Sequence, residues 1–325
     1  MSQNTILEAK NVVKFFPIRA GLLSRHVGDV RAVDGVSFEV KKGETLGLVG
    51  ESGCGKSTLG RSLLKLLDIT SGNVSFKGEN LSQLKGKKLR MVRKNLQMIF
   101  QDPYASLNPR MTTAKIISEP FRIHKIGNKK EQAQKTIALM KQVGLKTSQL
   151  DRYPHEFSGG QRQRISIARA IAVEPDVLVA DEAVSALDVS IQAQILNLMK
   201  KLQKEMGLTY LFISHDLSVM AHMCDRIAIM YLGKIVELAN KDDIFSNPRH
   251  PYTKALLEAV PIAGRGKRKH RKLLKGDVPS PINPPAGCHF HPRCEFAKGI
   301  CQQEMPGLKS ANRNDSQEVA CWLLS

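Results

Sequence analysis

The chain has 325 residues, 42% of them apolar, and a formal net charge of +19, so it is long enough for one large or two modest domains. No stretch approaches the roughly 18 uninterrupted apolar residues of a membrane span, and the first residues lack the pattern of a secretory signal. Aromatic residues make up 5% and are not interleaved with the basic runs, which argues against a single-strand nucleic-acid platform.

The first elements predicted are strands. Residues 6–14 alternate loosely as one strand, Pro17 to Val30 is predicted as a partly basic insertion, and Ala32 to Val40 resumes the alternation. Thr45 to Val49 is a short apolar run that favours a buried strand, and Leu59 to Leu67 suits a helix. The earlier strands would form a small sheet beside this central strand.

Between that strand and that helix lies the pattern G-x-x-x-x-G-K-S, a phosphate-binding loop. Its glycines let successive backbone N–H groups point at the phosphates, and the helix start adds partial positive charge. Lys56 is expected to reach the β- and γ-phosphates and the Ser57 hydroxyl to ligate Mg²⁺. The residues expected to contact the nucleotide here are Gly50, Glu51, Ser52, Gly53, Cys54, Gly55, Lys56, Ser57 and Thr58.

The middle of the chain is predicted to be helical. A short strand over residues 73–76 and another over 97–101, ending at Gln101, precede helical segments from Pro103 to about Tyr153, including Lys130 to Val143. A second glycine pair follows Ser158, which is placed as a helix N-cap, and an alanine-rich helix is predicted over residues 165–173. Glycines at a helix start make a second anion site by the same physics.

Two further strands deliver polar residues at their carboxyl ends. Residues 176–180 lead to Asp181 and Glu182, and residues 208–214 lead to His215, where ligands of parallel sheets bind. Between them a helix is predicted to end at Met206 before Gly207. Residues 227–237 are predicted as a hairpin that turns at Leu232 and Gly233.

The six cysteines divide into two isolated ones, Cys54 and Cys224, which we interpret as packing residues, and a C-terminal group. The group is spaced C-x5-C-x6-C-x19-C, and four soft ligands suit zinc or an iron–sulfur cluster, although reduced structural cysteines fit the same spacing. Its members are Cys288, Cys294, Cys301 and Cys321.

The phosphate loop, Gln101, FSGGQ, DVLVADE, SALD and His215, in this order, resemble the ATP-binding subunit of an ABC transporter over roughly residues 5–262. The resemblance implies an α/β fold: a P-loop ABC ATPase core over residues 1–262 with a helical subdomain inserted at about 103–165. Residues 263–325 would be a basic linker and a cysteine-containing C-terminal extension.

The resemblance also implies roles for single residues, with ATP and Mg²⁺ as cofactors. Phe16 would stack on adenine, Glu182 would polarise the attacking water, and His215 would contact the γ-phosphate. Ala183 stands where the family usually has proline and is expected to loosen the turn that carries Glu182. Mg²⁺ would be held by Ser57, Gln101 and Asp181. A partner's ATP would be contacted by Ser158, Gly159, Gly160 and Gln161, with Asp188 at the dimer interface.

The segments PYASLNP, NPRHPYT and GCHFHPRC are similar to those of dipeptide and oligopeptide importers, closest to the second of their two ATPase subunits. Members of that subfamily are thought to carry a four-iron cluster on the C-terminal cysteines. The implied partners are a sister ATPase subunit or a second copy, two membrane permeases and a peptide-binding protein outside the membrane. The implied location is peripheral, on the cytoplasmic face of the cell membrane.

Other readings stay open at this point. Importers of nickel, murein peptides or cationic peptides share the same segments. A soluble ABC ATPase acting on DNA or ribosomes would suit the basic runs Lys85 to Lys94 and Arg265 to Lys275, although solvated surface explains such runs equally well and no nucleic acid is expected. A non-catalytic partner in a heterodimer gains no support, because every motif residue is intact.

Overall fold

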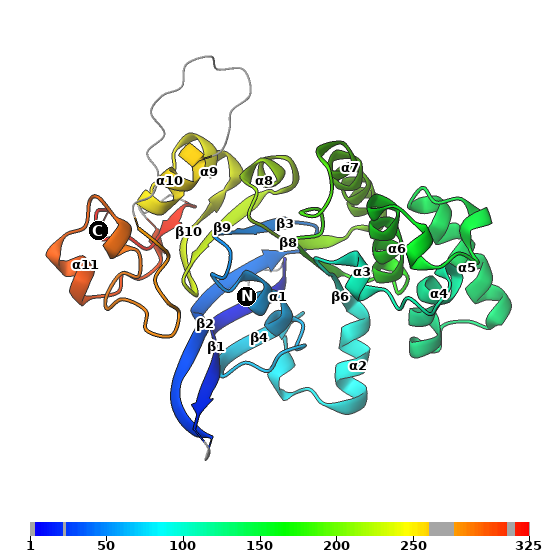
Figure 1. The fold of residues 1–325 in the computed structure, drawn as a ribbon, viewed down its shortest axis with the longest axis horizontal. Coiled ribbons are helices and arrows are strands. Elements are labelled where there is room, and N and C mark those ends of the chain that lie inside the picture. Colours follow the sequence, from blue (N-terminus) through cyan, green and yellow to red (C-terminus); the bar gives the residue numbers. More distant parts are fainter. Residues whose placement is uncertain (1–3, 22–23, 260–275, 311–315, 325) are drawn as a thin grey trace. The chain divides into compact units, whose positions relative to one another are not determined.

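A computed structural model describes residues 4–21, 24–259, 276–310 and 316–324 (Figure 1). The chain forms two compact units. The first comprises Met1–Val40, Thr45–Ser82 and Ser214–Ser325, and the second comprises Lys41–Glu44 and Gln83–Ile213. No helix among the described residues is both long enough and apolar enough to cross a membrane.

The first unit contains a four-stranded sheet in the order β2-β1-β4-β5. β1 pairs antiparallel with β4, and Leu7 lies opposite Phe76. The start of β1 is partly buried: its apolar residues Ile6, Leu7, Ala9 and Val12 are buried, whereas Lys10 and Asn11 are exposed. The strands are β1 (Thr5–Ala20), β2 (Arg25–Lys41), β4 (Ser71–Phe76) and β5 (Glu79–Asn80).

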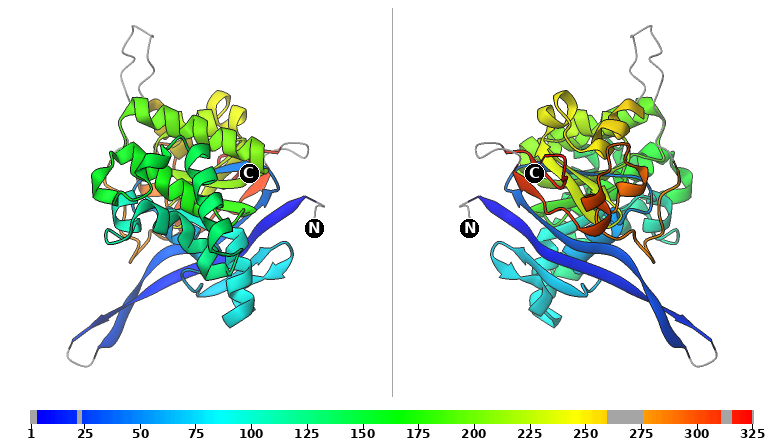
Figure 2. Two further views of the ribbon diagram at one scale, coloured as in Figure 1. Left: turned by 90° about the vertical axis from the view of Figure 1, so that its right-hand side faces the viewer. Right: turned by 90° about the vertical axis from the view of Figure 1, so that its left-hand side faces the viewer.

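Residues 17–30, predicted as an insertion that interrupts two strands, instead extend both strands. β1 continues to Ala20 and β2 begins at Arg25, so most of this stretch forms the two arms of a hairpin, which Figure 2 shows as two long blue strands. The Ser24 N–H donates to the Gly21 carbonyl at 3.0 Å, and both residues have positive φ, as the turn requires. The arms are largely exposed on both faces, so no apolar alternation revealed them.

A second, mixed sheet of the first unit supports the phosphate loop. β3 and β9 are parallel, with Leu46 opposite Arg226, and β9 forms the predicted hairpin with β10, turning at Leu232 and Gly233. All five residues of β3 are buried. The strands of this part are β3 (Thr45–Val49), β9 (Arg226–Tyr231), β10 (Lys234–Asn240), β12 (Glu318–Val319) and β11 (Lys309–Ser310).

The helices of the first unit are short. α1 begins at Lys56, directly after the loop, and ends at Leu63, four residues before the predicted end, because Lys65 adopts a positive φ that a helix cannot continue. They are α1 (Lys56–Leu63), α8 (Leu217–Met223), α9 (Lys241–Ser246), α10 (Pro251–Ala259) and α11 (Gly299–Gln303).

The second unit is built on three parallel strands in the order β8-β7-β6. They are apolar runs, as expected for parallel strands covered on both faces. β6 ends two residues before Gln101, which therefore lies in the loop after the strand. The strands are β6 (Leu96–Ile99), β7 (Val177–Asp181) and β8 (Thr209–Ser214).

Six α-helices complete the second unit. α6 begins at Gly159 rather than near Ile165 as predicted, because Ser158 caps it, and it packs against α4 and α7. α7 ends at Met206 before Gly207, as predicted. The helices are α2 (Gly86–Asn95), α3 (Pro103–Ser106), α4 (Thr113–His124), α5 (Lys129–Gln142), α6 (Gly159–Ile171) and α7 (Val189–Met206).

Of the two basic runs, the first forms α2 and the second, residues 265–275, lies outside the described residues. None of the residues of α2 is buried, so the described run is a solvated helix.

Candidate nucleotide site

The phosphate loop follows β3 and makes two close approaches to neighbouring backbone. A Cβ atom at Gly50 would overlap the carbonyl oxygen of Met230, and one at Gly55 would overlap that of Ala32. Gly55 also has a φ of +106°, which only glycine adopts without strain. These two positions therefore require glycine, as the sequence pattern predicts.

Lys56 is buried, with 4% of its surface exposed, and its ammonium group points back into the loop. The Nζ atom donates to the carbonyl oxygens of Gly50 at 2.8 Å and Glu51 at 2.9 Å. It also lies 3.8 Å from the Sγ atom of Cys54, a buried residue whose thiol pKa is raised by desolvation. The positive charge is thus held inside the curl where phosphates are expected, next to the start of α1.

Three contacts tie the loop to distant parts of the first unit. The Glu51 N–H donates to the Tyr252 hydroxyl at 3.0 Å, and the Gly233 N–H donates to the Cys54 carbonyl at 3.0 Å. The Glu51 carboxylate forms an ion pair with Arg293. The sequence did not predict these contacts of Tyr252 and Arg293, although both residues lie in the segments NPRHPYT and GCHFHPRC.

In the second unit the structure brings Gln101 and Glu182 together. The Gln101 Nε2 atom donates to Glu182 Oε2 at 2.8 Å. Asp181 is the last residue of β7 and is fully buried, and Glu182 follows with a φ of +46°, a strained conformation for a residue with a side chain. The Glu182 N–H donates to the Ile213 carbonyl at 2.9 Å, which attaches this turn to β8.

The Ser158–Gln161 segment forms the capped start of α6. The Gln161 N–H donates to Ser158 Oγ at 3.4 Å and the Ser158 N–H donates to Gln161 Oε1 at 3.1 Å, a capping box. Gly159 is exposed, whereas Gly160 is buried, and a Cβ atom there would overlap the side chain of Ile191. The predicted N-cap is confirmed, and the glycine at 160 permits close packing of α6 on α7.

Asp188 caps α7 in the same unit. Its carboxylate accepts from the Ile191 N–H at 3.0 Å and from the Ser190 hydroxyl at 2.9 Å, and these hydrogen bonds, the first above all, lower its pKa. The side chain is exposed. A charged surface carboxylate is therefore fixed at the start of this helix.

His215 and Phe16 both belong to the first unit. His215 is exposed, so it is not a core histidine, and it precedes Asp216, which caps α8 by accepting from the Ser218 N–H at 2.8 Å. Phe16 lies on β1, half-buried, with the Lys14 ammonium 4.8 Å from its ring centroid. The face of the Phe16 ring is thus in contact with a cation within the chain.

The four C-terminal cysteines converge on one small pocket, which Phe290 and His250 also line. Cys288 donates its N–H to the Cys301 carbonyl at 2.9 Å, and burial raises the pKa of the Cys288 thiol to about 11, with the neighbouring thiols acting in the same direction. Four thiol groups therefore line one pocket. The described residues nevertheless contain no group of three ligand side chains in a metal-binding arrangement. Cys54 and Cys224 are buried packing residues, as predicted.

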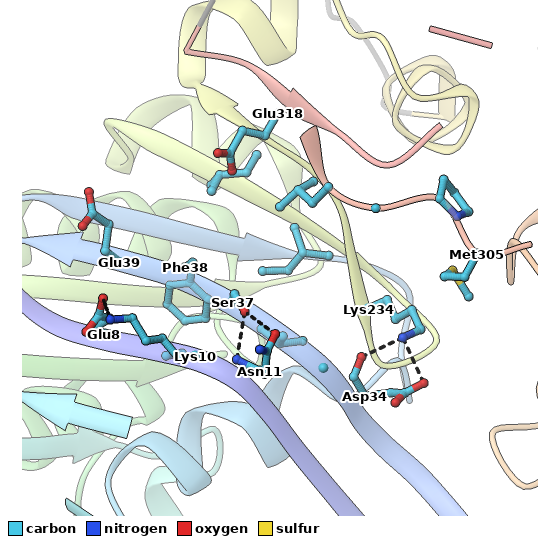
Figure 3. Close-up of a pocket in the computed structure, with 18 of the residues that line it drawn as sticks. Glu8, Lys10, Asn11, Asp34, Ser37, Phe38, Glu39, Lys234, Met305 and Glu318 are labelled. Carbon is cyan, nitrogen blue, oxygen red and sulfur yellow. Dashed lines mark hydrogen bonds and ion pairs between the residues drawn. The ribbon is translucent and has the colours of Figure 1, made fainter. Parts of the chain in front are cut away.

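The first unit also has a cleft of about 650 Å³ between β1, β2, β10 and residues 305–308 (Figure 3). Its polar side chains bond to one another: Lys234 Nζ lies 3.1 Å from Asp34 Oδ2, and the Ser37 hydroxyl donates to Asn11 Oδ1 at 3.1 Å. None of the predicted nucleotide-contacting residues lines this cleft, so it is separate from the phosphate loop.

A glycine loop enclosing a lysine, a capped second glycine segment and acidic residues after a buried strand define an ATP-binding protein of the ABC class. Residues 33–185 match the family model described as ABC transporter, and residues 236–301 match that described as oligopeptide/dipeptide transporter, C-terminal region. The second match includes Tyr252 and Arg293.

The comparisons with curated proteins cover the whole chain. It is 58% identical to the oligopeptide transport ATP-binding protein AppF of Bacillus subtilis, over 100% of this chain and 99% of that protein. It is 49% identical to the dipeptide transport ATP-binding protein DppF of Escherichia coli, over 98% and 95%.

Among solved structures, the dimeric ATP-binding cassette MJ0796 bound to ADP and Pi matches with a TM-score of 0.65 and 28% identity. The match covers 73% of this chain and 99% of that one. The chain belongs to the ABC transporter family of ATP-binding, ATP-hydrolysing subunits.

Proposed function

We propose that the chain powers the import of dipeptides or oligopeptides through a membrane transporter. The observation that carries this proposal is the match of residues 236–301 to the C-terminal region of oligopeptide and dipeptide transporters. The names of the full-length relatives AppF and DppF support the same substrate class.

In this proposal the chemistry is phosphoryl transfer to water, which depends on positioning and charge neutralisation. Lys56 and the loop N–H groups neutralise the β- and γ-phosphates, and Phe16 stacks on adenine. Glu182 orients and polarises the attacking water, held in its rotamer by the hydrogen bond from Gln101. His215 contacts the γ-phosphate, and its exposure in the structure supports a role outside the core.

Mg²⁺ would be held by Ser57, Gln101 and Asp181. Hydroxyl, amide and carboxylate oxygens are the hard donors that this ion prefers, so the donor set fits. When bound, the ion supplies positive charge to the β- and γ-phosphate oxygens.

Two ATPase subunits would sandwich ATP, with the phosphate loop of one facing the Ser158–Gln161 segment of the other. The exposed Ser158 and Gly159 at the start of α6 and the dimeric structure of MJ0796 support this arrangement. The second subunit is a sister ATPase or another copy of this chain, and Asp188 lies at the interface between them. Asp188 is exposed and fixed, which suits that place.

The ATPase pair would act with two membrane permeases and a peptide-binding protein, peripherally on the cytoplasmic face of the membrane. Residues 101–109 and the helical subdomain at about 103–165 would pass the closing movement to the permeases. Residues 1–262 would form the ABC domain and residues 263–325 the linker and extension.

The four C-terminal cysteines would bind a structural metal group, a four-iron cluster or zinc. Their convergence on one pocket supports this, although the described residues contain no group of three potential ligands arranged to hold a metal ion. Protein purified without air is expected to contain iron and acid-labile sulfide, or zinc. Absence of all three from such a preparation would contradict the assignment.

The test of peptide import is uptake by the native cell. Deletion of the gene for this chain should abolish uptake of a labelled tripeptide. Expression of the wild-type chain should restore uptake, whereas expression of Glu182→Gln should not. Unchanged tripeptide uptake together with lost uptake of Ni²⁺ would contradict the proposal and favour a nickel importer.

A further inference from the structure

The C-terminal extension reaches the phosphate loop through one ion pair. Arg293 Nη1 lies 2.8 Å from Glu51 Oε2, and Arg293 Nη2 lies 3.1 Å from Glu51 Oε1. This is the two-pronged geometry that guanidinium and carboxylate form best. The pair joins residues 242 positions apart, and the side chains are only 6% and 24% exposed.

An aromatic cluster fixes the arginine in place. Its guanidinium carbon lies 5.9 Å from the ring centroid of Tyr231, whose hydroxyl also accepts from Nη1 at 3.5 Å. Phe290, three residues before Arg293, packs on Tyr231 and Tyr252 with centroids 5.3 and 5.4 Å apart. Burial opposes the charge on Arg293, but the hydrogen bonds to Glu51 and Tyr231 outweigh it and raise the arginine's pKa.

A second connection holds the extension against the same region. The Nδ1 atom of the buried His289 lies 3.0 Å from the Leu232 carbonyl oxygen. Gly233, which follows Leu232, donates its N–H to the carbonyl of Cys54 in the phosphate loop. The extension, the β9–β10 turn and the phosphate loop are therefore joined by hydrogen bonds on two sides.

Glu51 is the point where these contacts bear on ATP. Its carbonyl accepts from Lys56, and its N–H is held by Tyr252, so its position affects both the catalytic lysine and the course of the loop backbone. Its carboxylate also places a negative charge beside a site for a polyphosphate, and a like charge nearby weakens anion binding unless it is paired. Arg293 supplies that pairing.

We propose that Arg293 is a positioning residue for ATP binding: it neutralises and fixes Glu51, so the C-terminal extension sets the affinity of the phosphate loop for nucleotide. The relation holds whatever solute is transported. It makes the extension part of the nucleotide site rather than an appendage.

The first measurement is MgATP binding by calorimetry, with the KM and kcat of hydrolysis, for wild type and Arg293→Gln. The variant keeps a polar side chain but loses the positive charge and the two-pronged contact with Glu51. Typical couplings between sites span about 5- to 150-fold, and we expect a rise in Kd and KM at the lower end, about tenfold, with kcat within about twofold of wild type. Unchanged Kd and KM would overturn the proposal.

The decisive variant is the pair Glu51→Gln with Arg293→Gln. In Arg293→Gln the carboxylate of Glu51 is left without its ion-pair partner, and Glu51→Gln removes that negative charge. The double variant should therefore regain at least about half of the binding free energy lost in Arg293→Gln. A purely packing role for Arg293 predicts no such recovery, and a double variant as weak as Arg293→Gln would overturn the proposal.

Two further variants separate this effect from misfolding. Lys309→Gln removes a positive charge from an exposed site on the same extension and should leave Kd unchanged. Arg293→Lys keeps the charge as a single prong, so it should bind ATP more tightly than Arg293→Gln, and equal or weaker binding would contradict the proposal. Wild-type chain that binds no MgATP would instead contradict the family function.

Discussion

The phosphate loop and the Ser158–Gln161 segment both place glycines at the start of a helix, and they differ in how their own unit holds them. The loop encloses a buried lysine and is tied to Arg293, Tyr252 and the β9–β10 turn. The second segment is held by a capping box of its own, with Ser158 and Gly159 exposed. This difference fits our proposal that the first binds an anion within its own chain, whereas the second presents its N–H groups to a partner.

We expect the largest effect on ATP binding and hydrolysis from substitution of Lys56, since the Ser158–Gln161 segment has no corresponding lysine. Lys56→Ala removes the charge at the centre of the curl, so we expect ATP binding to weaken strongly and hydrolysis to fall by a factor of about 100 or more. Nucleotide binding and phosphate release assays measure both. Lys298→Ala, an exposed lysine of the extension, is the control, and hydrolysis retained in Lys56→Ala would show that the loop is not the phosphate site.

Gly160→Ala tests the second segment. The added Cβ would overlap Ile191 and displace the start of α6, so we expect MgATP binding by the monomer within about threefold of wild type, but ATP-dependent dimerisation and hydrolysis reduced at least tenfold. Gel filtration with ATP separates the two effects. Gly299→Ala, where a Cβ meets nothing within 4 Å, is the matched control. If Gly160→Ala abolished ATP binding by the monomer, the contrast between the two segments would fail.

We expect the free energy of unfolding to decrease at acidic pH because of His250, which lies close to Tyr252, a contact of the phosphate loop. His250, whose Nδ1 accepts from the Tyr252 N–H, is buried, and desolvation lowers its pKa from 6.5 to about 3. Below pH 6.5 His250 therefore binds a proton in the unfolded chain, whereas it stays neutral in the folded chain. The free energy of unfolding consequently decreases as the pH falls.

For this one group the loss between pH 7 and pH 5 is about 2 kcal/mol of unfolding free energy. Denaturant titrations at the two pH values measure it. His250→Asn, which cannot titrate there, should show a correspondingly smaller loss than wild type, and equal losses would contradict the assignment.

The smallest effect concerns the cap. Ser158→Ala removes the acceptor for the Gln161 N–H and should lower unfolding free energy by about 1 kcal/mol, whereas Ser158→Thr should retain most of it. Thermal denaturation followed by circular dichroism compares them. Equal destabilisation of the two variants would mean that the hydroxyl does not hold the helix start.

The predictable parts of this molecule are those in which a local pattern determines the structure. The Thr45–Val49 strand, the Leu232–Gly233 turn and the Ser158 cap follow from short runs of residue types. The outer arms of the β1–β2 hairpin were missed because exposed strands need no apolar alternation. The Arg293–Glu51 pair was missed for another reason: it joins residues 242 apart, and only the packing of the extension reveals it.

The cysteine group is an intermediate case. Sequence grouping predicted that Cys288, Cys294, Cys301 and Cys321 lie together, and they line one pocket. Metal binding depends on distances and angles between the sulfur atoms, which spacing along the chain does not determine.

We propose that Glu182, held by Gln101, drives hydrolysis of ATP bound between two subunits. The most direct measurement is ATP hydrolysis by the purified chain with and without Glu182→Gln, with its size followed by gel filtration in the presence of ATP. We predict that the variant loses hydrolysis by a factor of about 100 or more, in the range of general-base catalysis, and that ATP now traps a dimer. A variant that hydrolyses ATP as fast as wild type would show that Glu182 does not activate the attacking water.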